Sequence, residues 1–162
     1  MPGANELVVI STGPLVSLGR AGLLEVVGRL TLTFITPSAV ADEINVGSAA
    51  GHPVEVPGWV GVVDVPEPVT ALAAQALDRG EAAVIQLALD RGIRTVCIDE
   101  WRGRRAARAS GLIVTGSLGL LGRAKHEGLV SSVRPFVKLL ADRGAFYHPD
   151  LVRRFLEAMG EA

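Results

Sequence analysis

The stretch Thr95-Val96-Cys97-Ile98-Asp99-Glu100 places two acidic residues directly after an apolar run. A short apolar run bounded by polar residues is typical of a strand that is buried on both faces. A carboxylate at the end of such a strand contributes nothing to packing, so Asp99 and Glu100 are candidates for chemistry. The Ala- and Arg-rich segment 102–109 that follows predicts a helix. The stretch therefore predicts one strand–helix unit with an acidic turn in its middle.

The same alternation of strand and helix extends in both directions along the chain. Strands are predicted at 7–10, 31–35, 59–65, 95–98 and 112–114. Helices are predicted at 14–27, from 36 to beyond 44, and at 69–77, 81–89, 102–109, 117–127, 134–142 and 149–159, with a loop over 46–58. Strands that alternate with helices predict a mostly parallel sheet that is covered on both faces.

The tripeptide Asp-Arg-Gly occurs three times, ending at Gly80, Gly92 and Gly144. We interpret it as a helix end, because glycine commonly follows the last turn of a helix and a basic residue favours that turn. Three further glycines, at 116, 119 and 122, have helical spacing and predict close packing of one helix against a neighbour.

Length and composition limit the class of protein. The chain has 162 residues, which predicts a single domain, and 49% hydrophobic against 20% charged residues exclude a disordered chain. The single cysteine, Cys97, excludes a disulfide framework and is expected in the core. The uncharged run 109–122 is too short and too polar to cross a bilayer. No basic start of a signal peptide precedes the first apolar run, so we expect a cytoplasmic protein.

Charge is distributed unevenly along the chain. Residues 1–78 contain two basic and eight acidic side chains, a net charge of −6, whereas residues 79–162 contain 14 basic and nine acidic ones, a net charge of +5. Much of the excess lies between 94 and 125, where seven basic residues accompany only Asp99 and Glu100. Such a field suits a polyanion partner, and it is equally compatible with a solvated helix face.

Polar residues follow three of the predicted strands. The carboxyl ends of parallel strands meet at one crevice, so we expect Ser11-Thr12, Asp99-Glu100 and 115–117 to lie together. Glu43 and Glu81 lie on helices that this fold can bring to the same edge. Each acid alone could be a cap, a helix-dipole partner or a solvated residue. A cluster of carboxylates requires a cation, and oxygen ligands favour Mg²⁺ or Mn²⁺.

Five short segments in this order resemble PIN domains. They are Val8-Val9-Ile10-Ser11-Thr12-Gly13-Pro14-Leu15, Thr36-Pro37-x-x-Val40-x-x-Glu43-Ile44, Gly80-Glu81-Ala82-x-x-Ile85-x-Leu87-Ala88, Cys97-Ile98-Asp99-Glu100-x-x-Gly103-Arg104-x-Ala106 and Val114-Thr115-Gly116-Ser117-Leu118-Gly119. The resemblance runs from about residue 7 to residue 158. It is strongest to a prokaryotic group of predicted nucleic-acid-binding PIN proteins related to the VapC-like toxins of toxin–antitoxin pairs.

The resemblance implies a single PIN-like domain over 1–162, built as a three-layer α/β/α sandwich. It implies a metal-dependent ribonuclease that uses Mg²⁺ or Mn²⁺. By position, Glu43, Glu81 and Asp99 match the catalytic, metal-binding acids of the family, and Glu100 matches a further metal ligand. The hydroxyl groups expected near the metal or the phosphate belong to Ser11, Thr12, Thr115 and Ser117.

Ser11 departs from the family pattern, which usually has an aspartate at this position. A serine contributes no charge, so its presence weakens the expected metal site. Two hypotheses therefore stand. The first is a toxin-like ribonuclease, and the second is a catalytically degenerate PIN module that binds RNA or a protein partner.

The expected partners are RNA, an antitoxin-like protein and a second copy of the chain, with no membrane. Arg102, Arg104 and Arg105 are expected to contact phosphates, and Trp101 either stacks on a base or packs in the core. Apolar residues over 134–160 predict either a dimer or partner interface or ordinary core packing.

Overall fold

The computed structural model describes residues 5–49, 54–66, 70–76 and 78–162. Its centre is a five-stranded sheet in the order β3-β2-β1-β4-β5, and every neighbouring pair of strands is parallel. The strands are β1 (Glu6–Ile10), β2 (Leu32–Pro37), β3 (Val60–Val63), β4 (Thr95–Cys97) and β5 (Ile113–Thr115). Helices cover both faces, so the predicted three-layer α/β/α sandwich with a parallel sheet is confirmed.

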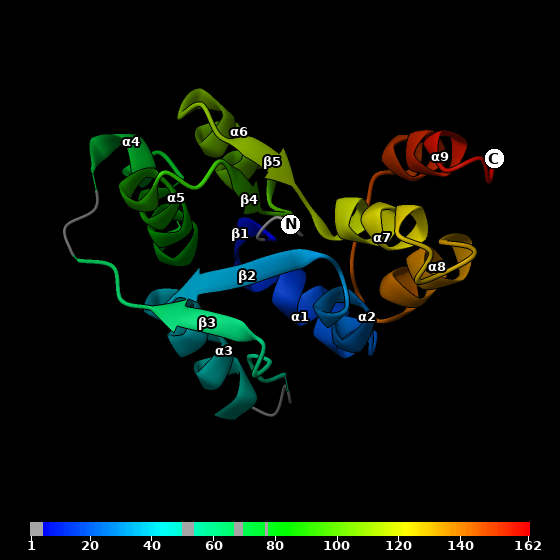
Figure 1. Ribbon diagram of the computed structural model, residues 1–162, viewed down its shortest axis with the longest axis horizontal. Coiled ribbons are helices and arrows are strands. Elements are labelled where there is room, and N and C mark those ends of the chain that lie inside the picture. Colours follow the sequence, from blue (N-terminus) through cyan, green and yellow to red (C-terminus); the bar gives the residue numbers. More distant parts are fainter. Residues whose placement is uncertain (1–4, 50–53, 67–69, 77) are drawn as a thin grey trace.

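The described helices alternate with the strands as predicted. They are α1 (Thr12–Arg20), α2 (Leu24–Gly28), α3 (Ser38–Ala49), α4 (Ala71–Ala74), α5 (Arg79–Arg91), α6 (Trp101–Ala109), α7 (Ser117–His126), α8 (Arg134–Asp142) and α9 (Pro149–Ala158). Figure 1 shows α4 and α5 on one side of the molecule and the three last helices, α7 to α9, gathered on the other. No helix in the described part of the chain is long and apolar enough to cross a membrane.

Two sequence-based helix boundaries are wrong. The helix predicted over 14–27 is divided into α1 and α2, because Gly22 between them has a φ of 70°, which a continuing helix cannot contain. The loop predicted over 46–58 begins later, since α3 continues to Ala49. Residues 50–53 of that loop, and residues 69 and 77 at the ends of the predicted helix 69–77, lie outside the described residues.

The Asp-Arg-Gly interpretation holds at two of the three sites. Gly92 ends α5 with a φ of 62°, and Gly144 follows α8 with a φ of 98°. At residues 78–80 the interpretation is wrong, because the tripeptide begins a helix there. Asp78 is the N-cap of α5, and its carboxylate accepts a hydrogen bond from the Glu81 backbone N–H at 3.0 Å.

Helix α5 packs against the middle strands of the sheet, where it contacts β1, β2 and β4. All of its residues from Gly80 to Ala88 are buried, including Glu81. The strands beneath it are equally inaccessible, with Val9, Ile10 and Cys97 each 0% exposed. The expectation that Cys97 is a core residue is therefore confirmed. Packing does not explain why a charged residue such as Glu81 is buried at this position.

The C-terminal apolar residues are divided between core and surface. Val133, Val137, Leu140 and Leu156 are buried, whereas Phe146 is 85% exposed and Leu151 is 51% exposed. At Gly122 of α7, a β-carbon would lie 3.2 Å from Phe155 and 3.3 Å from Met159, the closest neighbours from the α9 side. The predicted close packing is therefore confirmed at Gly122 only, since a β-carbon at Gly116 would instead meet Asp99 Oδ1 at 2.6 Å and one at Gly119 would meet Thr115.

Candidate active site at the carboxyl edge of the sheet

The carboxyl ends of β1, β4 and β5 carry the polar residues that the sequence placed there. Ser11 directly follows β1, is 1% exposed, and donates its backbone N–H to the carbonyl of Cys97 at 3.0 Å. Asp99 lies two residues after β4, Thr115 ends β5, and Ser117 begins α7. The fold therefore brings these four residues to one edge of the sheet, as expected.

Glu43 reaches this edge from α3. Its Oε2 accepts a hydrogen bond from the Thr12 hydroxyl at 2.6 Å, which connects it to the first turn of α1. Its other oxygen lies against the backbone of α5, where a β-carbon on Gly80 would be 2.5 Å from Oε1. Glycine at position 80 thus provides the space for the Glu43 carboxylate, a role different from the helix end that the sequence suggested.

Glu81 is the most unusual side chain of the site. It is 9% exposed, and its Oε2 is buried without a hydrogen-bond partner among the described residues. Burial, reinforced by the nearby charges of Asp78, Glu100 and Glu43, raises the pKa of Glu81 to about 8. Gly103 of α6 faces it so closely that a β-carbon there would lie 2.6 Å from Oε2. The fold holds this carboxylate in place while leaving one oxygen unsatisfied.

Asp99, in contrast, has partners for both oxygens. Its Oδ1 accepts the Ser117 backbone N–H at 2.8 Å, and its Oδ2 accepts the Ser117 hydroxyl at 2.5 Å. Both donors come from the first residue of α7, so this helix start fixes the position of the carboxylate. Ser117 is therefore a direct partner of Asp99.

Tyr147, from the segment between α8 and α9, lies close to Asp99 and Ser117. Burial, followed by the charge of Asp99, raises the pKa of the Tyr147 hydroxyl to about 12.

Glu100 has a local structural role. It is the N-cap of α6, and its Oε2 accepts the Gly103 backbone N–H at 3.0 Å. Its carboxylate is near enough to Glu81 to raise the pKa of that residue. Glu43, Glu81 and Glu100 thus form the electrostatically coupled part of the predicted metal-binding set, while Asp99 is held separately by α7.

The acidic residues fit a divalent metal ion through few direct ligands. Within the described ranges, no three His, Cys, Asp or Glu side chains are close enough to form a complete ligand group. Mg²⁺ does not need such a group, because it usually keeps several water ligands and binds through one or two carboxylates together with substrate phosphate. A buried carboxylate oxygen without a donor, beside a second carboxylate, fits a hard cation.

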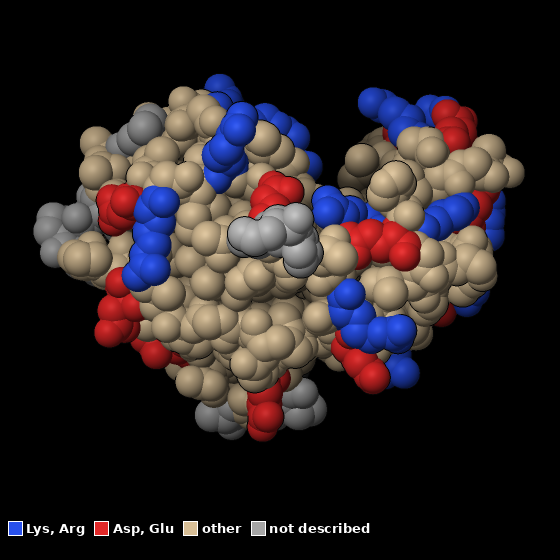
Figure 2. Space-filling view, in the orientation of Figure 1, with Lys and Arg blue, Asp and Glu red and all other residues tan. Residues whose placement is uncertain are grey.

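The predicted phosphate-contacting residues divide into two groups. Arg104 points inward, and its Nη1 donates to the carbonyls of Ile98 at 2.7 Å and Thr115 at 3.1 Å. Burial, followed by the charge of Arg108, lowers the pKa of Arg104. Arg102 and Arg105 are exposed. Figure 2 shows basic side chains gathered on the surface over α6.

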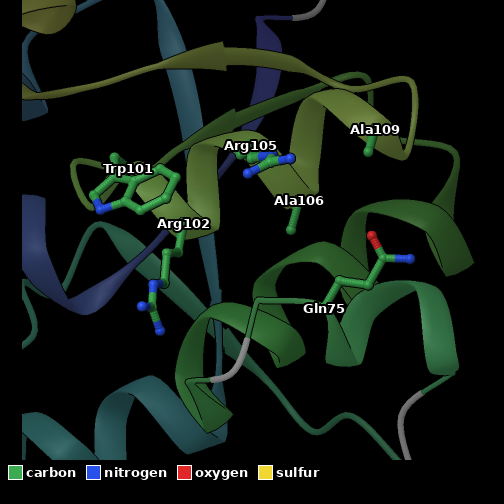
Figure 3. Close-up of a pocket in the computed structure, with 6 residues that line it drawn as sticks. All are labelled: Gln75, Trp101, Arg102, Arg105, Ala106 and Ala109. Carbon is green, nitrogen blue, oxygen red and sulfur yellow. The ribbon is translucent and has the colours of Figure 1, made fainter.

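The alternative prediction that Trp101 packs in the core is wrong. It is 61% exposed at the start of α6, and the guanidinium carbon of Arg102 lies 5.8 Å from its ring centroid. The other tryptophan, Trp59, packs edge-to-face on Phe34 with a centroid distance of 5.5 Å. Figure 3 shows the pocket beside Trp101, of about 490 Å³, whose lining residues are Gln75, Trp101, Arg102, Arg105, Ala106 and Ala109.

A groove of about 540 Å³ lies on the other side of Trp101 and contains Asp99. Its lining includes two residues that the sequence-based site omitted, Arg108 and Tyr147. Arg108 could have been found, because it lies four residues after Arg104 on one helix and so shares its face. Tyr147 lies within the apolar region 134–160, but nothing in the sequence indicates that it lies near Asp99, because it is distant in sequence from every predicted site residue.

Comparison with known families gives one match. A family model described as a PIN domain matches residues 7–161, from β1 to the residue that follows α9 and its turn. Comparison with curated proteins and with solved structures gives no match.

Proposed function

The chain belongs to the PIN-domain family, which has a nuclease-type fold, and on this basis we propose that it is a metal-dependent endoribonuclease. The observation that carries the proposal is the Oε2 of Glu81, which is buried beside Glu43 at the carboxyl edge of the sheet and has no hydrogen-bond partner in the described part of the chain. Burying an ionised carboxylate without a donor is unfavourable, and a bound cation removes that cost. The proposed ion is Mg²⁺ or Mn²⁺.

Each acidic residue has its own task in this proposal. Glu43, Glu81 and Asp99 would hold the ion, one or two of them directly and the others through its water ligands, with Glu100 as an additional ligand at the rim. A bound divalent ion polarises the phosphate and lowers the pKa of a coordinated water. Thr12 orients Glu43 by its hydrogen bond, and Ser117 holds Asp99 in place by two hydrogen bonds. The hydroxyls of Ser11 and Thr115 are proposed to contact the ion's water shell or the phosphate.

One observation favours a second candidate function. Ser11 occupies the end of β1, where PIN domains usually carry an aspartate, and it adds no negative charge to the site. On this ground the alternative is a catalytically degenerate PIN module that binds RNA or a protein partner. Both candidates use the arginines of α6 and Trp101 as the nucleic-acid-binding surface.

Cleavage of a mixed single-stranded RNA pool in Mn²⁺, Mg²⁺ or EDTA separates the two candidates. The control is the double variant Glu81→Ala/Asp99→Ala, used at a temperature where it is folded. Metal-dependent cleavage that the double variant loses supports the ribonuclease. Cleavage absent in the wild type and gained in Ser11→Asp supports the degenerate module. Absence of cleavage in both chains contradicts the ribonuclease proposal.

We further propose a toxin-like role in the cytoplasm, with an antitoxin-like partner and a homodimer. The support is Phe146, which is 85% exposed between α8 and α9 within the predicted interface region 134–160. Sedimentation of the wild type and Phe146→Ala at micromolar concentration tests the dimer. A wild-type dimer that becomes monomeric in the variant is expected, and a wild-type monomer contradicts it.

A further inference from the structure

We propose that the groove between α6 and α9 binds one nucleotide of single-stranded RNA, with the base against α9 and the phosphate toward α6. This inference rests on the proposed function in taking RNA as the ligand. It adds a nucleobase subsite, formed by Tyr147, Leu151 and Phe155, beside Asp99. None of these three residues belongs to the site predicted from the sequence.

The groove has two chemically different walls. Arg104 and Arg108 line it from α6, while Leu151 and Phe155 line it from α9, and Asp99 lies between them. Its volume of about 540 Å³ falls within the range of roughly 300–1,000 Å³ that is typical of small-ligand sites. Figure 2 shows the surface indented between the part over α6 and the part over α9. The space is therefore open to a ligand from solvent.

The α6 wall carries two positive charges, which the nearby Asp99 offsets only in part. Among the described residues, no carboxylate forms an ion pair with Arg108, and Arg104 uses only its Nη1 for the two backbone carbonyls. A guanidinium has five N–H donors, so both arginines retain donors that can face a phosphate. The charge of this wall complements the backbone of a nucleic acid and not a purely apolar ligand.

The α9 wall provides apolar surface that the fold leaves uncovered. Leu151 is 51% exposed, whereas Leu156 of the same helix is 8% exposed and belongs to the core. Tyr147 and Phe155 place two aromatic rings in the same lining. A nucleobase has two flat faces that stack on such rings. Because double-stranded RNA hides its base faces within the stack, the groove selects an unpaired base.

The experiment measures binding in EDTA, so that no cleavage takes place. It compares a short unstructured RNA oligonucleotide with a ribose-phosphate oligomer of the same length and charge that lacks bases. We expect the wild type to bind the RNA at least about tenfold more tightly than the baseless oligomer. Leu151→Ala should reduce this ratio by roughly threefold, because it removes part of the base-contacting surface.

Two variants serve as controls. Val62→Ala removes an aliphatic side chain that is also 51% exposed, from β3 at the opposite edge of the sheet, and should leave the ratio unchanged. Arg108→Ala should weaken binding of both oligomers by the same factor, because it acts on phosphate.

An unchanged ratio in Leu151→Ala overturns the inference. So does a change in sedimentation of that variant, which would identify the wall as a self-association surface. In a further outcome, the wild type cleaves no RNA while Leu151→Ala still loses the base preference. That combination supports the subsite and contradicts only the nuclease proposal.

Discussion

Glu81 and Glu161 show how differently this chain treats two carboxylates. Glu161, near the C-terminus, accepts hydrogen bonds from Lys125 Nζ at 2.7 Å, the Ser132 hydroxyl at 2.5 Å and the Val133 backbone N–H at 2.9 Å. These donors lower its pKa to about 2. Glu81, at the carboxyl edge of the sheet, has a buried oxygen with no donor in the described structure, and its pKa is raised to about 8.

The comparison of Glu161 with Glu81 shows where a carboxylate stabilises the fold and where it does not. Glu161 connects α7, the start of α8 and the C-terminus, and its donors satisfy its charge. Glu81 is placed among Asp78, Glu100 and Glu43, which repel its charge. A side chain kept in an unfavourable environment is a candidate for function, and one in a favourable environment has a structural role. Substitutions at the two positions should therefore have opposite effects.

The largest expected effect is on cleavage by the Glu81→Gln variant. This change removes the charge but keeps the size and shape of the side chain, so the fold should persist. We expect the metal-dependent cleavage rate to fall at least about hundredfold, because a ligand of the ion is lost. Initial rates on single-stranded RNA in Mn²⁺ measure the effect. Glu161→Gln is the matched control and should cleave at the wild-type rate at a temperature where both are folded. Equal losses of cleavage rate in Glu81→Gln and Glu161→Gln would contradict the assignment of a functional role to Glu81 and a structural role to Glu161.

The second effect is the pH dependence of stability. Glu81 has a pKa of about 8 in the folded protein and 4.5 as its ordinary value, so the folded state binds more protons between these values. The free energy of unfolding should therefore decrease as pH rises from about 4.5 to about 8, by an amount on the order of 2 kcal/mol. Urea unfolding at several pH values in EDTA measures the decrease.

Glu81→Gln should remove that decrease and be more stable than the wild type at pH 8. Added Mg²⁺ should also reduce it in the wild type, since a cation favours the ionised carboxylate. A free energy of unfolding that rises from about pH 4.5 to about pH 8 in the wild type would contradict the prediction, because it would show that ionisation of Glu81 does not destabilise the fold.

The order of strands and helices was predictable because it depends on local patterns. Apolar runs such as 95–98 and their glycine-ended helices indicate strand and helix without knowledge of the tertiary contacts. The carboxyl edge of the sheet was predictable for the same reason, since the topology alone brings Ser11, Asp99 and Ser117 together. Some helix boundaries were predicted wrongly, because one tripeptide can occur at either end of a helix. Asp-Arg-Gly ends a helix at Gly92, whereas at residues 78–80 the Asp78 side chain caps the start of α5.

The state of each acidic residue could not be predicted from the sequence. Glu100 and Asp99 are adjacent, yet the first caps α6 and the second receives two hydrogen bonds from α7. That no described residue donates to Oε2 of Glu81 depends on how closely α6 approaches α5, which is a tertiary distance. The exposure of Trp101 likewise depends on which face of α6 meets the sheet. The proposed nucleobase wall comes from residues more than 40 positions after Asp99, and no local pattern connects them.

The third effect distinguishes two glycines that both lie within helices. In Gly103→Ala the new β-carbon would lie 2.6 Å from Glu81 Oε2 and 2.9 Å from Ile98, so Glu81 or α6 must move. We expect a loss of roughly 1–3 kcal/mol in stability, together with reduced cleavage. The new β-carbon of Gly47→Ala in α3 meets no described residue within 4 Å, and the variant should be more stable by about 0.5–1 kcal/mol. Thermal unfolding and cleavage rates of the two variants give the comparison, and equal effects would show that Gly103 does not restrain Glu81.

The smallest effect concerns Glu161→Gln, and its direction is the opposite of that at Glu81. An amide keeps one oxygen for the Val133 N–H but loses the attraction of Lys125, so we expect the Tm to fall by a few degrees. The pKa of Glu161 is lowered to about 2, which means that its stabilising contribution is complete above about pH 4.5 and is lost as pH falls toward 2. The Tm difference between wild type and variant should therefore be full at pH 7 and shrink on acidification. A difference that persists at pH 2 would mean that hydrogen bonds, and not the charge, hold the C-terminus to α7 and α8.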